Sequence, residues 1–124
     1  MNCPKCQKPM EKVKFESIEV DRCTGCKGIW FDELELGDLM KLAGSEKLDI
    51  GDPKEGKQLA AKDQIDCPVC ATRMIRMVAL DQHHIWYECC KICGGVFFDA
   101  GEFKDFKEKT VLDFFKDLFT KARK

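Results

Sequence analysis

Eight of the nine cysteines in this chain fall into four C-x-x-C pairs, and the four pairs form the same pattern twice. A C-x-x-C turn points two thiolates at one point, so a second turn can complete a tetrahedron of sulfur ligands. Two such pairs at this separation are a strong metal-site signal, and we predict two four-cysteine sites. The predicted ligands are Cys3, Cys6, Cys23 and Cys26 in the first copy and Cys67, Cys70, Cys90 and Cys93 in the second.

The repeat extends past the cysteines. Residues 27–36 read KGIWFDELEL and residues 94–103 read GGVFFDAGEF, so Gly, aliphatic, aromatic, Phe, Asp and Glu positions correspond. The offset between the copies is 64 residues at the first pair and 67 at the second, so the second copy has three extra residues between its pairs. This regularity indicates one small unit duplicated in tandem.

These motifs resemble the zinc ribbon, in particular the transcription factor IIB-type zinc-ribbon family of short prokaryotic proteins. The resemblance rests on C-P-x-C, on C-x-x-C-x-G-I-W-F-D with the Glu that follows, and on their counterparts in the second copy. It covers about residues 1–44 and 65–106. It implies one Zn²⁺ held by the four cysteines of each copy, hence two per chain. Zinc ribbons serve many unrelated roles. A role in transcription is therefore suggested only by the name of the family and by no other feature of the sequence.

The expected fold is a small metal-stabilised α+β protein of two tandem zinc ribbons. Each ribbon is a β-hairpin plus a short strand, followed by a helix. Asp32 and Asp99 are predicted N-caps, with Glu35 and Glu102 in the capping-box position. We expect the first helix over about 33–43, ending at Gly44, and the second as a long amphipathic helix from near residue 100.

Three segments are predicted along the chain. Residues 1–44 hold the first ribbon and its helix, residues 45–66 form a polar linker, and residues 67–124 hold the second ribbon and the C-terminal helix. Within the linker, residues 59–61 are compatible with a helical turn. Gly28 and Gly95 are expected to take positive φ and approach the sulfurs closely. Because each ribbon is too small for a self-sufficient core, folding is expected to require metal.

Charge and hydropathy limit the cellular location and the kinds of partner that we expect for this chain. The start of the chain carries no apolar signal segment and no run of 18 apolar residues occurs, so we expect a cytoplasmic chain without a transmembrane segment. Reduced thiols there favour metal over disulfides. The formal net charge is −1, and eight thiolates with two Zn²⁺ take it to about −5. Nucleic-acid modules are usually basic, although Lys5, Lys8, Lys12 and Lys14 form a local positive strip.

Three further residues have metal-binding side chains. Cys89 precedes Cys90 and matches Arg22 in the first copy, so we interpret it as a spare thiol. The alternative is a redox-sensitive thiol that exchanges with Cys90 and ejects the metal. His83 and His84 have no partners at ligand spacing and are expected at a solvated hairpin tip. A four-cysteine site has no open position for water or substrate, so we predict neither catalytic nor cofactor-binding residues and no enzyme activity.

The expected function is a non-catalytic protein-interaction module. The C-terminal stretch carries apolar residues at roughly helical spacing, which predicts a protein partner or self-association through that helix. Packing on the chain's own ribbons and binding to a membrane surface are the alternatives for this helix. For the whole protein, the alternatives are a nucleic-acid-associated transcription or regulatory factor and an iron-binding or redox-sensing protein, because an all-sulfur site does not separate Fe from Zn.

Overall fold

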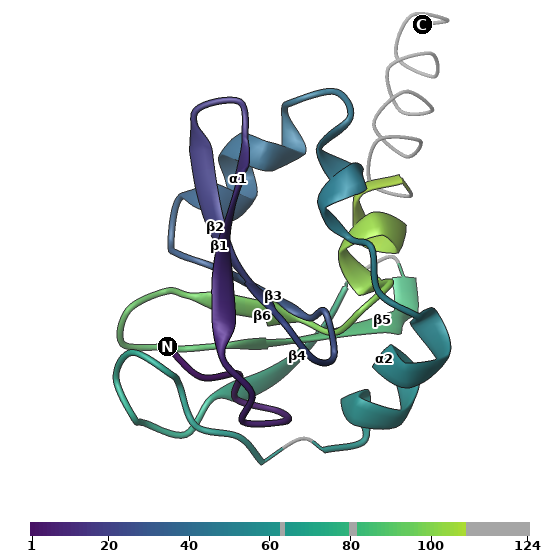
Figure 1. The fold of residues 1–124 in the computed structure, drawn as a ribbon. Coiled ribbons are helices and arrows are strands. Elements are labelled where there is room, and N and C mark those ends of the chain that lie inside the picture. The colour runs from purple at the N-terminus through teal and green to yellow at the C-terminus, as the bar shows by residue number, and fades with distance from the viewer. Residues whose placement is uncertain (63, 80–81, 109–124) are drawn as a thin grey trace, which may run out of the picture.

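A computed structural model describes residues 1–62, 64–79 and 82–108. Across these residues, strands from both copies form one antiparallel sheet in the order β1-β2-β3-β6-β5-β4 (Figure 1). The strands are β1 (Met10–Phe15), β2 (Ile18–Cys23), β3 (Ile29–Phe31), β4 (Ile75–Ala79), β5 (Gln82–Cys89) and β6 (Val96–Phe98). The predicted α+β class is confirmed. The joining of the two hairpins into a single sheet was not predicted.

The two copies meet at the centre of the sheet, where β3 pairs with β6. The register joins Ile29 with Phe98, Trp30 with Phe97, and Phe31 with Val96. The sequence repeat aligns Ile29 with Val96 and Phe31 with Phe98. The pairing is therefore symmetric about Trp30 and Phe97, so an approximate twofold axis relates the copies at this strand pair.

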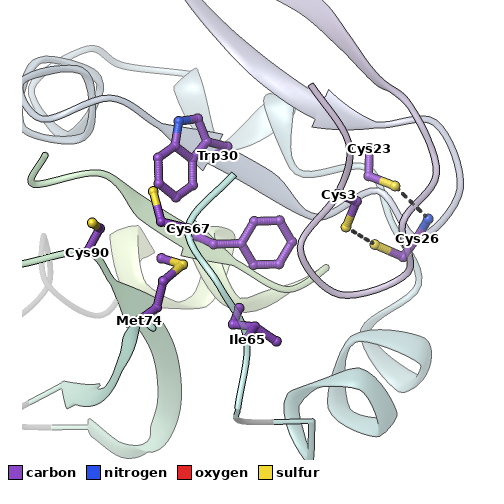
Figure 2. Close-up of a cluster of buried hydrophobic side chains, with 9 residues drawn as sticks. Cys3, Cys23, Cys26, Trp30, Ile65, Cys67, Met74 and Cys90 are labelled. Atoms are coloured by element: carbon purple, nitrogen blue, oxygen red, sulfur yellow. Dashed lines mark hydrogen bonds between the residues drawn. The ribbon is translucent and has the colours of Figure 1, made fainter. Parts of the chain in front are cut away.

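The sheet has two covered faces, because successive side chains of a strand point to opposite sides. On one face, α1 (Glu35–Met40), η1 (Ser45–Leu48) and the helical residues 102–108 enclose a phenylalanine core. There the ring centroids of Phe31 and Phe103 lie 4.9 Å apart. On the other face, Trp30 and Phe97 pack among the cysteines with Ile65 and Met74 (Figure 2).

Gly28 and Gly95 have a packing role that corrects our expectation. Neither takes positive φ; the left-handed residues lie one position earlier, at Lys27 (64°) and Gly94 (76°). A Cβ on Gly28 would overlap the Phe97 ring, and a Cβ on Gly95 would overlap the Trp30 ring. Each glycine therefore lets the central aromatic ring of the other copy lie against its backbone.

Gly95→Ala should destabilise the protein by about 1–3 kcal/mol, because the added methyl group must displace a fully buried Trp30. Gly37→Ala is the matched control: its Cβ would meet nothing within 4 Å, and alanine favours the helix over glycine by up to about 1 kcal/mol. Thermal or urea unfolding of the zinc-loaded variants measures both. A Gly95→Ala midpoint equal to the parent's would contradict this packing.

The helix ends follow the predicted caps only in part. Helix α1 is shorter than the predicted 33–43. Glu35 Oε1 accepts a 2.8 Å hydrogen bond from Asp32 N, which is half of a capping box. The Asp32 side chain accepts from the Trp30 indole, and it is the Asp32 carbonyl oxygen that accepts from Glu35 N, at 3.0 Å. The predicted end at Gly44 is wrong: α1 ends at Met40 with Lys41 as its C-cap, and Gly44, left-handed at φ 87°, is instead the N-cap of η1.

The second helix is capped from a distance. Asp49 accepts hydrogen bonds from Gly101 N (2.8 Å) and Lys104 N (3.0 Å). Asp99, the predicted N-cap, is instead buried beside Lys5. Residues 102–108 are helical, and the rest of the predicted long amphipathic helix, 109–124, lies outside the described residues. None of the helices in the described ranges has the length and apolar character needed to cross a membrane.

The predicted polar linker, residues 45–66, contains more structure than one helical turn. It includes η1 and α2 (Pro53–Ala60), which begins with Asp52 accepting from Lys54 N at 2.9 Å. A Cβ on Gly56 would overlap the Ala100 carbonyl, so α2 lies directly against the second copy. The segment boundaries at residues 44 and 67 stay a prediction.

Candidate metal centres

Each C-x-x-C pair forms the same turn. The residue after each second cysteine is left-handed, and it is Gln7, Lys27, Ala71 or Gly94. The first cysteine of each pair donates its N–H to the carbonyl five residues later, at 2.8–2.9 Å. This repeated turn places both side chains of a pair on the same side of the backbone. Two turns facing each other can therefore gather four sulfurs.

The eight predicted ligands lie in two groups, Cys3, Cys6, Cys23 and Cys26, and Cys67, Cys70, Cys90 and Cys93. Within each group all ligand atoms lie within 4.8 Å of one another. The Sγ atoms of Cys3 and Cys26 are 3.7 Å apart, and those of Cys67 and Cys93 are 3.8 Å apart. A tetrahedron with Zn–S bonds of about 2.3 Å has edges of about 3.8 Å. The donor sets fit a zinc ion, and each group can hold one.

The comparison with known families agrees with this geometry. Residues 2–42 and 66–109 match the family model described as transcription factor zinc-finger, the transcription factor IIB-type zinc ribbon. The chain belongs to this family. The two matches contain all eight ligands and confirm the resemblance in the motifs, so the chain is a zinc-binding protein. No curated protein and no solved structure matches it.

Backbone N–H groups of the zinc-ribbon turns point at the sulfurs. Cys67 Sγ accepts from Val69 N at 3.3 Å and from Cys70 N at 3.2 Å. Burial raises the pKa of the Cys90 thiol, but the amides of Cys93 and Ile92 and the Thr72 hydroxyl outweigh it and bring that pKa to about 6. Such donors stabilise thiolates and offset the −2 charge of a zinc ion held by four of them.

Cys89 lies outside both ligand groups. Its half-buried Sγ is 3.8 Å from the Cys90 carbonyl oxygen. Burial raises the pKa of the Cys89 thiol, and the neighbouring Cys90 and Cys93 raise it further. A raised pKa is the opposite of what a reactive thiol needs, which favours the spare-thiol interpretation. His83 and His84 fall at the start of β5, and their solvated role stays a prediction.

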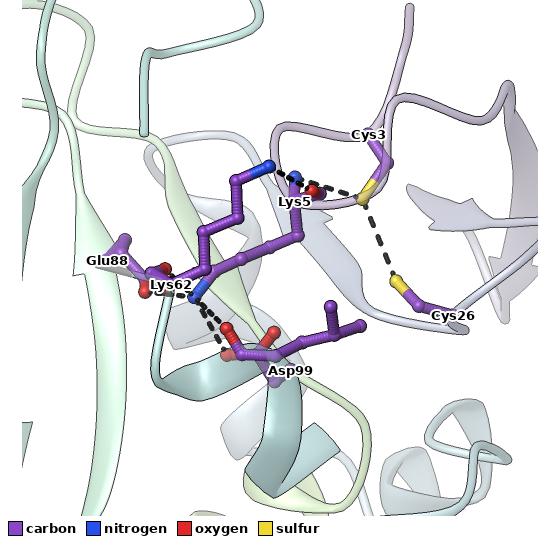
Figure 3. A network of polar contacts seen from close by, with 7 residues as sticks. Cys3, Lys5, Cys26, Lys62, Glu88 and Asp99 are labelled. Atoms are coloured by element: carbon purple, nitrogen blue, oxygen red, sulfur yellow. Dashed lines mark hydrogen bonds and ion pairs between the residues drawn. The ribbon is translucent and has the colours of Figure 1, made fainter. Parts of the chain in front are cut away.

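The charged group that sequence reasoning missed is Lys5, the third residue of the first C-P-K-C turn (Figure 3). Its side chain is fully buried, and Nζ lies 2.6 Å from Glu88 Oε1 and 3.3 Å from Asp99 Oδ2. Nζ also donates to the carbonyls of Leu59 (3.0 Å) and Lys62 (2.6 Å). The first zinc turn is thus tied to β5, to the residue after β6 and to the end of α2.

Two buried carboxylates share this one ammonium. Burial raises the pKa of Glu88 to about 7, even though Lys5 lowers it. Burial also raises the pKa of Asp99. The expected positive strip is therefore wrong at Lys5, which is inaccessible, and Lys12 is engaged by Asp21 at 3.0 Å. Of the four strip lysines, Lys8 and Lys14 are exposed, and neither forms an ion pair with another described residue.

Glu102 gives a pH-dependent prediction. Burial, with a smaller contribution from the neighbouring Asp105 and Asp99, raises its pKa to about 7. The pKa of an unfolded glutamate is about 4.5, so the folded protein binds this proton more tightly than the unfolded chain. The stability that this gives is fully present below about pH 4.5 and is lost as the pH rises through the folded pKa. Glu102→Gln should therefore stabilise the zinc-loaded protein more at pH 8 than at pH 6, as urea unfolding at the two pH values would measure. An equal effect at both would contradict the raised pKa.

Proposed function

We propose that this zinc-ribbon protein is a non-catalytic protein-interaction module. Four sulfur ligands complete each tetrahedral site and leave no position for water or substrate, which supports a structural role for the metal. The observation that carries the proposal is an exposed apolar surface beside the second zinc site. Apolar side chains gathered on a surface are typical of contact sites.

We call this surface the knuckle face and define it by Leu34, Val69 and Ile92. Val69 and Ile92 are the tips of the two C-x-x-C turns of the second copy, 54% and 72% exposed, and Leu34, before α1, is 75% exposed. A Cβ on Gly94, next to the second turn, would lie 2.8 Å from Glu33 Cγ. The second turn and the approach to α1 are therefore neighbours, and the first turn lies beside the second because the four sulfurs of the site lie within 4.8 Å of one another.

On the first zinc site, the chain's own residues 49–62 cover the positions equivalent to Val69 and Leu34, whereas Gly25, the equivalent of Ile92, lies beside the Lys8 side chain. The repeat aligns Val69 with Lys5, Leu34 with Gly101, and Gly94 with Lys27. Lys5 lies under the Leu59 and Lys62 carbonyls, Gly101 lies under Pro53, and Lys27 lies under Gly51.

Residues 49–62 therefore cover two of the three positions on the first copy, whereas Leu34, Val69 and Ile92 are all exposed on the second. The two copies are related by an approximate twofold axis, and the first copy binds a segment of the chain at this position. We therefore expect the second copy to bind a peptide segment at the equivalent position.

The second candidate is a nucleic-acid-associated regulatory factor, which the family description favours. Such binding needs phosphate contacts from clustered Lys and Arg. The exposed Lys8 and Lys14 remain, on a protein whose zinc-loaded charge is about −5. The charge balance supports the protein-interaction role over this one.

Comparative capture tests the proposal. Zinc-loaded full-length protein, Ile92→Asp and the control Ile50→Asp would each be used as bait, with bound proteins quantified by mass spectrometry. Ile50 is 56% exposed but lies in the covering segment rather than on the knuckle face. We expect proteins that the parent and Ile50→Asp retain and Ile92→Asp loses. Sub-micromolar DNA or RNA binding at physiological salt, with no protein separating the baits, would favour the second candidate.

A further inference from the structure

We infer that the knuckle face of one copy binds the C-terminal segment 109–124 of a second copy. This inference rests on the proposed interaction role and names the partner of the same surface. Three features of the described residues and the sequence carry it: the charge around the knuckle face, the chemistry of the segment, and the place where the described chain ends.

The knuckle face has an acidic border. Asp32, Glu33 and Asp38 are exposed on either side of Leu34, and Lys91 is the cation next to Ile92. In the equivalent position of the other copy, Asp99 is buried and neutralised by Lys5. A partner that complements the knuckle face therefore has apolar side chains opposite its centre and basic side chains opposite its border.

The segment 109–124 has this chemistry. It reads KTVLDFFKDLFTKARK, with five Lys or Arg and two Asp. Its large apolar residues are Val111, Leu112, Phe114, Phe115, Leu118 and Phe119. Full burial of one Phe is worth about 2 kcal/mol, so a site for several of them is strongly favoured.

The described chain ends on the sheet face opposite the zinc turns, so its own segment would have to pass round the edge of the sheet to reach its own knuckle face. Residues 102–108 lie on the sheet face of α1 and η1, where Lys107 Nζ donates to Leu42 O (2.5 Å) and lies 3.2 Å from Glu46 Oε2. The zinc turns lie on the opposite sheet face, with Trp30 and Phe97. In Figure 1 the loops of the second zinc site project at the left, away from the yellow-green helix. A second copy meets no such constraint, and reciprocal exchange of segments closes a twofold dimer.

Sedimentation velocity of the zinc-loaded full-length chain, from 1 to 100 µM or thereabouts, tests the inference. We expect a dimer for the parent and the control Ile50→Asp. Ile92→Asp on the knuckle face and Phe115→Asp in the segment should each raise the dimer dissociation constant at least about tenfold. The zinc content of both variants is measured alongside, so that a loss of folding is recognised.

Mixing the two variants makes the test specific. Ile92→Asp keeps an intact segment and Phe115→Asp keeps an intact knuckle face, so the mixture should form a heterodimer that neither variant forms alone. A parent that is monomeric throughout, a dimer insensitive to either change, or a mixture without heterodimer would overturn the inference. A monomeric parent whose captured proteins still depend on Ile92 would leave the proposed function standing while this inference falls.

Discussion

Cys90→Ser should unfold both zinc ribbons and not only the second. A structural Zn²⁺ contributes on the order of 10 kcal/mol to folding, and a whole domain has about 5–15 kcal/mol of stability. The two ribbons share the β3–β6 pairing, and Lys5 of the first zinc turn depends on Glu88 of β5. Loss of the second site therefore removes the support of the first.

Two measurements follow this unfolding: hydrogen exchange of the β1–β3 amides and the zinc content per chain. In Cys90→Ser, protection should fall across β1–β3 as well as β4–β6, and zinc should fall well below two equivalents. Cys89→Ser is the matched control, because Cys89 lies outside the ligand group, and it should keep both metals and full protection. Native-like protection of β1–β3 in Cys90→Ser would mean that the ribbons fold independently.

Lys5→Met should cost about 3–5 kcal/mol of unfolding free energy, because it removes the ammonium that lies 2.6 Å from the buried Glu88 carboxylate and 3.3 Å from the buried Asp99 carboxylate. Methionine replaces most of the lysine volume, so the loss reports on charge more than on packing. The loss should grow between pH 6 and pH 8, since Glu88, with a pKa of about 7, is largely protonated at the lower value. Urea unfolding of the zinc-loaded variant measures it.

Lys14→Met is the control for Lys5→Met, because Lys14 is an exposed lysine on the same copy. It should change the unfolding free energy by less than about 0.5 kcal/mol. Glu88→Gln in the Lys5→Met background should recover part of the loss, because it removes one of the two buried carboxylates that Lys5 contacts. A Lys5→Met protein as stable as the parent would show that the ammonium does not neutralise the two carboxylates.

The zinc sites were predictable because their information is local. Cysteine spacing fixes the turn, the ligand set and the ribbon family, and the duplication separates Cys90 from Cys89. The pairing of the two ribbons into one sheet was not predictable. Strands β3 and β6 are each three residues long, and their sequence pattern does not identify the strand with which each pairs. Gly28 and Gly95 did indicate that another group lies close to the backbone. We expected that group to be a cysteine sulfur, whereas in the structure it is the Phe97 ring at Gly28 and the Trp30 ring at Gly95.

Lys5 was misplaced for a related reason. A lysine next to a ligand is normally solvated, and its partners Glu88 and Asp99 lie far along the chain. The sequence did contain one signal. The second copy has Val69 at the position of Lys5, so zinc binding itself does not require a lysine there. Residues 45–66 were read as a linker from their polar composition, although Gly51 and Gly56 both mark close contacts with Ala100.

The central claim is that this chain is a duplicated zinc ribbon with two structural metal sites. Elemental analysis of the full-length protein, purified without added metal and referred to its measured concentration, tests that claim most directly. We predict two zinc atoms per chain, one for each four-cysteine group. One zinc atom per chain, or iron as the main metal, would contradict it.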